Sequence, residues 1–217
     1  IVCSGDKNYT FPANIEGSPL DWDFVESKYW CTQVVKVEQY IDLFKVTDEY
    51  SNIDSYAIPE TSYTQRALEV DRSGGNTLNF DFVVKGIPTR FFLRKYIEEE
   101  IKGRGQYLND AKHLCIYLGN VKGISQLKVG FVTTDGYTYT QTIDLEKTKN
   151  VYKVLLTEMK QDYTALLPAP YPVFLERYFK PVEPIPFDAK RIEMLELSTV
   201  ESLSENSSLQ LKNVWIE

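Results

Sequence analysis

The chain has 217 residues, of which 43% are hydrophobic and 25% charged, a composition that excludes disordered and collagen-like proteins. Its 31 acidic and 24 basic side chains give a formal charge of −7, and the basic residues are dispersed along the chain, so nucleic acid is not an expected partner. No apolar run approaches the ~20 residues that a membrane-spanning helix needs. We therefore expect no membrane span and a single domain over residues 1–217.

Strands are expected first at 34–46, at 66–71 and, most clearly, at 77–84. In 77–84 the side chains of Leu78, Phe80 and Phe82 recur at every second position, with polar residues between them. This alternation is typical of a strand that buries one face. The chain is also rich in aromatic residues (13%), as half-buried sheets are.

A helix is predicted over 91–102, because Leu93, Tyr96, Ile97 and Ile101 follow one another at spacings of one, three or four residues. Glycine follows at position 103 as a stop signal. We expect this to be one short surface helix. A strand follows at 113–118.

The clearest hairpin joins 126–133 to 137–145 through the Asp135-Gly136 turn. Three more strands are expected, at 151–157, 191–198 and 209–216. In 209–216, Leu209 and Val214 share a face only if a β-bulge adds one residue near 212–213. Strand-sized segments dominate and helices do not alternate with them, which favours an antiparallel β-sandwich over a parallel α/β sheet.

A long loop stiffened by six prolines lies at 166–187, and aromatic residues are interspersed among the prolines. Loops of this length inside a domain are uncommon and tend to cap a core or to form a binding surface.

Four segments, 120–124 (NVKGI), 127–132 (LKVGFV), 135–140 (DGYTYT) and 211–217 (LKNVWIE), resemble those of a galactose-binding-like jelly roll. Together with 167–172 (LPAPYP), they look like the accessory and carbohydrate-binding modules attached to bacterial polysaccharide-degrading enzymes. The resemblance covers roughly the carboxy-terminal half of the chain. It implies an all-β sandwich that presents a face or its end loops to a glycan, beside a catalytic domain, in a secreted, periplasmic or cell-surface protein. It also implies a structural calcium between the first strand and a neighbouring loop.

A glycan site combines aromatic rings, which pack on sugar C–H groups, with planar groups that bond hydroxyls. The residues of this kind that we single out as candidates are Trp30, Tyr137, Tyr139, Gln141, Tyr171, Glu176, Arg177 and Tyr178. The alternative interpretation places Tyr137 and Tyr139 in the core, and makes the loop aromatics a lid over the end of the sandwich.

Metal and thiol chemistry have weak support. No acidic loop resembles an EF-hand, although carboxylates that could contribute to a calcium site occur at Asp21, Asp23, Asp71 and Asp135. The three cysteines, Cys3, Cys31 and Cys115, lack C-x-x-C spacing and allow one disulfide and one free thiol. A single histidine, His113, weakens any Ser-His or multi-histidine scheme.

The leading interpretation is a non-catalytic carbohydrate-binding or accessory module that captures bacterial glycans. One alternative is a glycoside hydrolase, for which Glu69 and Asp71 share a strand face, or a polysaccharide lyase. A lyase acting on a polyanion would suit a basic cleft, and no clustered basic strand face is apparent. The other alternative is a structural module that docks on protein.

Overall fold

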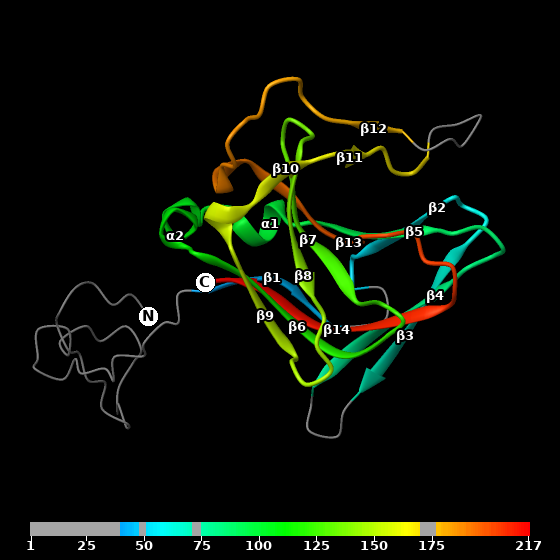
Figure 1. Ribbon diagram of the computed structural model, residues 1–217. Coiled ribbons are helices and arrows are strands. Elements are labelled where there is room, and N and C mark those ends of the chain that lie inside the picture. Colours follow the sequence, from blue (N-terminus) through cyan, green and yellow to red (C-terminus); the bar gives the residue numbers. More distant parts are fainter. Residues whose placement is uncertain (1–39, 48–50, 71–74, 170–176) are drawn as a thin grey trace, which may run out of the picture. The chain divides into compact units, whose positions relative to one another are not determined.

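Two six-stranded sheets, in which every pair of neighbouring strands is antiparallel, lie face to face (Figure 1). The computed structural model describes residues 40–47, 51–70, 75–169 and 177–217, all within one compact unit that spans 40–217. The antiparallel β-sandwich expected from the sequence is thus confirmed. That residues 1–217 form a single domain stays a prediction.

The first sheet has the order β3-β4-β14-β6-β9, and β1 also pairs with β14. Its strands are β1 (Ile41–Lys45), β3 (Tyr63–Val70), β4 (Asn76–Val83), β6 (His113–Lys122), β9 (Val151–Leu155) and β14 (Ser207–Ile216). The second sheet has the order β10-β8-β7-β13-β5-β2. Its strands are β2 (Asp54–Ile58), β5 (Arg90–Tyr96), β7 (Gln126–Thr133), β8 (Thr138–Asp144), β10 (Lys160–Asp162) and β13 (Ile192–Thr199).

The remaining elements are short. They are the strands β11 (Thr164–Ala165) and β12 (Tyr178–Phe179), the helices α1 (Glu98–Ile101) and α2 (Gly105–Asp110), and the 3₁₀ turns η2 (Leu156–Glu158) and η3 (Ala189–Arg191). Among the described residues, no helix is long and apolar enough to cross a membrane.

The core lies between the two sheets and is built by the alternation that the sequence shows. Leu78, Phe80 and Phe82 of β4 are all buried, and the rings of Phe80 and Phe82 lie 6.5 Å apart. The ring of Phe82 packs at 4.7 Å against that of Phe91 in the second sheet. Apolar burial of this kind supplies most of the stability of a sandwich.

The hairpin and the bulge are both confirmed. Strands β7 and β8 pair from Gln126 to Val132 around a turn in which Gly136 has a φ of 79°, a conformation that favours glycine. In β14 the pairing with β6 skips Lys212, so that Leu211 and Val214 both face the core. A second bulge, which the sequence analysis did not assign, lies in β13 between Ile192 and Met194.

The helix predicted over 91–102 is wrong for most of its length. Residues Arg90–Tyr96 form β5, in the interior of the second sheet between β13 and β2, and only Glu98–Ile101 are helical. Five successive residues of β5, including Arg94 and Lys95, are buried because both faces of this strand are covered. Burial on both faces removes the alternation that identifies a strand.

Two segments, 163–169 and 177–179, lie on the outer face of the second sheet, and we call them the strap (Figure 1). The chain then runs to Phe187, whose ring packs on Phe131 and Tyr139 of the main core. The strap contains β11 and β12, which pair with each other. Ala165 of β11 packs on Ile58 and Phe92 in a second, smaller core cluster. The second sheet is therefore covered on its inner face by the main core and on part of its outer face by the strap.

Gly130 allows β7 and β8 to approach each other. A Cβ atom at this position would lie 1.9 Å from the carbonyl oxygen of Tyr139, which is backbone and cannot rotate away. We expect Gly130→Ala to destabilise the protein by about 3 kcal/mol in urea unfolding, because the hairpin must separate to admit the methyl group. Gly105→Ala is the control, since its Cβ would meet nothing within 4 Å. Equal stability of the two variants would contradict this account.

Candidate functional site

A groove of about 800 Å³ lies at the edge of the second sheet where β7, β8 and β10 meet, and we call it the polar groove. Ten residues line it: two lysines, two carboxylates, three threonines, two glutamines and one methionine. They are Lys128, Thr140, Gln141, Thr142, Thr157, Glu158, Met159, Lys160, Gln161 and Asp162. The volume falls within the range of roughly 300 to 1,000 Å³ that is usual for ligand sites.

The short edge strand β10 gives the groove its form. Only three residues of β10 pair with β8, from Lys160 opposite Thr140 to Asp162 opposite Thr138. The residues before Lys160 form η2, so among the described residues the pairing of β10 with β8 ends at Thr140, and Thr142 of β8 is exposed. The edge of the sheet is consequently left open and polar.

Asp162 is the best-connected side chain of the groove. Its Oδ2 atom accepts hydrogen bonds from Lys128 Nζ (2.5 Å) and Thr140 Oγ1 (3.1 Å), and its Oδ1 atom accepts one from the backbone N–H of Tyr163 (2.7 Å). Burial alone would raise the pKa of Asp162, but these donors outweigh burial and hold the pKa below its usual value. The carboxylate therefore stays ionised and fixed in place.

Gln141 brings an unsatisfied acceptor to the groove. Its Nε2 atom donates to Glu158 Oε2 at 3.0 Å, while its Oε1 atom is buried without a hydrogen-bond partner among the described residues. An acceptor in this state costs about 1 to 3 kcal/mol, a cost that a hydrogen bond from a ligand hydroxyl would remove.

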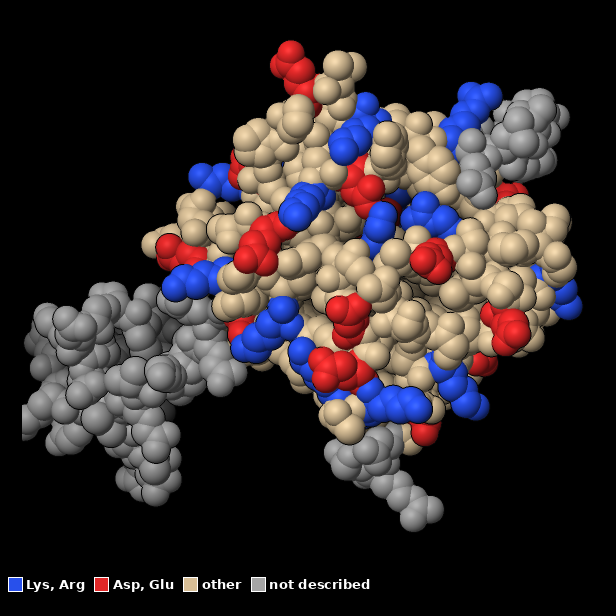
Figure 2. Space-filling model, viewed as in Figure 1, with Lys and Arg blue, Asp and Glu red and all other residues tan. Residues whose placement is uncertain are grey.

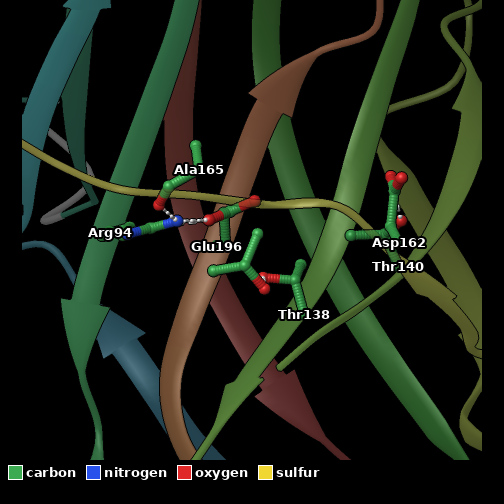
Figure 3. A network of polar contacts seen from close by, with 7 residues as sticks. Arg94, Thr138, Thr140, Asp162, Ala165 and Glu196 are labelled. Carbon is green, nitrogen blue, oxygen red and sulfur yellow. Dashed lines mark hydrogen bonds and ion pairs between the residues drawn. The ribbon is translucent and has the colours of Figure 1, made fainter. Parts of the chain in front are cut away.

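The polar contacts continue from the groove beneath the strap (Figure 3). Arg94 of β5 and Glu196 of β13 point toward each other and form an ion pair at 2.6 Å, with side chains 10% and 4% exposed. The Nη2 atom of Arg94 also donates to the carbonyl oxygen of Ala165 at 2.9 Å. Next to this pair, the hydroxyls of Thr138 and Thr164 are 2.8 Å apart. The sheet thus holds the strap through fixed polar contacts.

The candidate binding residues named from the sequence lie in different places in the structure. Gln141 lies in the polar groove. Tyr137 is half-buried, with its ring 6.0 Å from that of Phe179. Tyr139 is only 2% exposed and packs against Phe187, and burial raises the pKa of its hydroxyl. Tyr139 is thus a core residue and offers no ring to a ligand, which corrects its assignment as a binding residue.

The other candidates lie away from the groove or outside the described residues. Arg177 is exposed, and its carbonyl oxygen accepts a hydrogen bond from Leu166 N–H. Tyr178 is half-buried against the second core cluster, with the Arg90 guanidinium 5.6 Å from its ring. Neither residue lines the polar groove. Trp30, Tyr171 and Glu176 lie outside the described residues.

Sequence reasoning missed most of the groove. Lys128 and Asp162 are 34 positions apart, and only the order β10-β8-β7 makes them neighbours. The one available signal was Lys128 itself, a polar residue between apolar positions of a clear strand. An exposed aromatic residue was also missed: Tyr163, which follows Asp162 directly, is 62% exposed and has Lys180 Nζ 5.4 Å from its ring centre.

Metal ligands are sparse in the part of the chain that the structure describes: no three His, Cys, Asp or Glu side chains are grouped around a common point there. Of the four carboxylates considered for calcium, only Asp135 is described, and it pairs with Arg191 at 2.8 Å. Cys115 is a buried free thiol, and burial raises its pKa to about 12. Cys3 and Cys31 lie outside the described residues.

Comparison with known proteins supports the fold. The sequence matches no protein-family model and no curated protein sequence. A family 11 carbohydrate-binding module from Clostridium thermocellum, solved with a β-1,3-1,4-mixed-linked tetrasaccharide, superposes with a TM-score of 0.51 at 9% identity, over 79% of this chain and 94% of that one. The family 11 module of the cellulase Lic26A-Cel5E from the same organism gives 0.50 at 9% identity, over 81% and 91%. At this identity the likeness shows a shared β-sandwich fold.

The Arg94–Glu196 pair provides a test of how the strap is held. Glu196→Leu leaves the Arg94 charge buried without its partner, and we expect it to lower the free energy of unfolding by about 3 to 5 kcal/mol. The double variant Arg94→Met with Glu196→Leu removes both charges and should regain much of that loss. Urea unfolding measures both, and a double variant no more stable than Glu196→Leu alone would contradict the buried ion pair.

Asp162 makes stability depend on pH. Because its pKa is lower in the folded chain than in the unfolded chain, the ionised carboxylate stabilises the fold above its ordinary pKa. This contribution is lost as the pH falls through the lower, folded value. We expect Asp162→Asn to cost about 1 kcal/mol at pH 7 and to match the wild type in strong acid. The exposed Asp81→Asn is the control, and a pH-independent difference for Asp162→Asn would refute the assignment.

Proposed function

We propose that this chain is a carbohydrate-binding β-sandwich module that holds a glycan in the polar groove. The observation that carries the proposal is the set of fixed, mixed donors and acceptors at the open edge of β10-β8-β7. Sugar hydroxyls donate and accept at once, and a surface that alternates carboxylates, amides, lysines and hydroxyls can bond both functions. Two lysines balance two carboxylates there, which suits a neutral saccharide.

The groove is organised before a ligand arrives. Lys128, Thr140 and Asp162 hold one another, and Glu158 orients the Gln141 amide. Groups that are fixed in advance lose little conformational entropy on binding, which matters because water competes for every polar contact. Among the described residues, Tyr163 is an exposed aromatic ring that directly follows Asp162 of the groove, and it could pack on a sugar face.

The shared fold also supports the proposal. Both sandwiches reported above are named as carbohydrate-binding modules, and one was solved with an oligosaccharide. Our proposal for this chain accordingly includes an oligo- or polysaccharide ligand, a neighbouring catalytic domain and a secreted, periplasmic or cell-surface setting, where bacterial glycans are available.

Binding fits the groove better than hydrolysis does. A glycosidase needs a carboxyl group whose pKa is raised, so that it can donate a proton to the leaving oxygen. Asp162 has its pKa lowered by three donors and is a poor proton donor. We therefore propose a non-catalytic role for the groove.

Affinity electrophoresis and calorimetry with a panel of soluble neutral polysaccharides test the proposal. We expect a ligand to be found, and Gln141→Ala to weaken its binding about fivefold, because one hydrogen-bonding amide is removed. Gln65→Ala, an exposed glutamine on β3 of the other sheet, should bind as the wild type does.

Two results would contradict the proposal. One is a wild-type protein that retains its fold by circular dichroism and binds no glycan of the panel. The other is equal binding by Gln141→Ala and the wild type, which would place the glycan away from the polar groove.

A further inference from the structure

A second groove of about 800 Å³ is formed by the β6–β7 turn, the β8–β9 turn and neighbouring residues of β6 and β14. We call it the basic groove. Four lysines line it, Lys122 from β6, Lys147 and Lys149 from the β8–β9 turn and Lys212 from β14, together with a single carboxylate, Glu146. This local excess of three positive charges occurs in a chain whose formal charge is −7.

The local excess is a property of the groove. Over the face seen in Figure 2, Lys and Arg are interspersed with Asp and Glu, so this face is not divided into one basic and one acidic area. The polar groove has the same volume but balances Lys128 and Lys160 against Glu158 and Asp162. The two grooves therefore differ in charge far more than in size.

The lysines have few internal partners. Lys149 approaches Glu146 only at 3.9 Å, with both side chains at least half exposed, and lies 5.0 Å from the ring centre of Tyr152. Lys212 lies over the ring of Tyr117, also at 5.0 Å. Within the described ranges, Lys122 and Lys147 form no ion pair. A structural role as ion-pair partners does not account for these charges.

The walls of the groove are fixed. The hydroxyl of Tyr152 accepts from the N–H of Glu146 and donates to the carbonyl of Lys149, both at 2.9 Å, which pins the β8–β9 turn. On the opposite wall, Gln210 of β14 accepts a hydrogen bond from the N–H of Asn120 at 2.7 Å. The backbone that carries the lysines is therefore held in place by hydrogen bonds, which lowers the entropy cost of ordering it on ligand binding.

We propose that the basic groove binds the anionic group, carboxylate or sulfate ester, of an acidic polysaccharide. The proposal rests on the carbohydrate-binding function proposed above and extends it to a second, charge-selective site. Lysine ammonium groups pair with either anion, and the side-chain amides of Asn120 and Asn150 in the same groove suit the hydroxyls of the sugar that bears it. The lysines are up to 90 positions apart in the chain, which is why the sequence shows no clustered basic face.

The test compares Lys122→Gln/Lys147→Gln with Lys112→Gln/Lys190→Gln. All four lysines are exposed and form no ion pair with a described residue, and both double variants change the net charge equally. Binding is measured by calorimetry and affinity electrophoresis with polygalacturonate, a sulfated galactan, a neutral β-glucan and double-stranded DNA. We expect the groove variant to bind one acidic polysaccharide about tenfold more weakly and the control variant to bind as the wild type does.

The salt dependence of binding and the result with the neutral glycan distinguish this proposal from the proposed function. Binding of the acidic polysaccharide should weaken as added salt shortens the Debye length from ~30 Å to ~3 Å. Equal weakening by the two double variants, equal affinity for DNA, or no binding of either acidic polysaccharide would each overturn the basic groove. If a neutral glycan still binds and responds to Gln141→Ala, the proposed function stands although this inference fails. If no saccharide binds, both fail.

Discussion

The inner face of the second sheet is covered by the main core and part of its outer face by the strap, and this partial cover determines where polar side chains can lie on that side of the molecule. Its inner face meets the main core, and its outer face carries a buried Arg94–Glu196 pair that reaches the strap through the carbonyl oxygen of Ala165. Two charges in such a place are tolerated because they satisfy each other. Where the strap's coverage ends, at β10, the same sheet becomes open and polar. The polar groove lies on the part of this sheet that the strap leaves uncovered.

The pattern of apolar and polar residues was sufficient to predict the sandwich. Individual strands show why, because the burial of their faces determines the pattern. In β4 the core-facing side is buried and the other side carries polar residues. Apolar and polar residues therefore alternate, and this alternation identifies the strand in the sequence. In β14 the break in alternation at Lys212 predicted a bulge, because a misplaced residue would otherwise turn Val214 and Ile216 toward solvent. Strand β5 was predicted as a helix for the opposite reason. Both of its faces are covered, so its sequence shows no alternation of apolar and polar residues.

The sites were much harder to predict than the fold. Gln141 was identified because it shares a strand with two tyrosines, but the tyrosines themselves have structural roles: Tyr139 lies in the core and Tyr137 packs on Phe179. Aromatic residues on strands serve packing and recognition alike, and composition does not distinguish the two. Both grooves are assembled from side chains far apart in sequence, and their charge balance exists only after the strands have paired.

The position of β13 and β14 has a consequence for synthesis of the chain. β14 lies between β6 on one side and β4 and β1 on the other, and β13 lies between β7 and β5. Until residues 192–216 emerge from the ribosome, the first sheet would therefore consist of β3-β4, β6-β9 and an unpaired β1, and the second of β10-β8-β7 and β5-β2, with exposed edges. Such long-range pairing folds slowly and leaves unpaired strands open to association with other chains. The earlier strands are thus protected from aggregation only when β13 and β14 have been synthesised and pair with their edges.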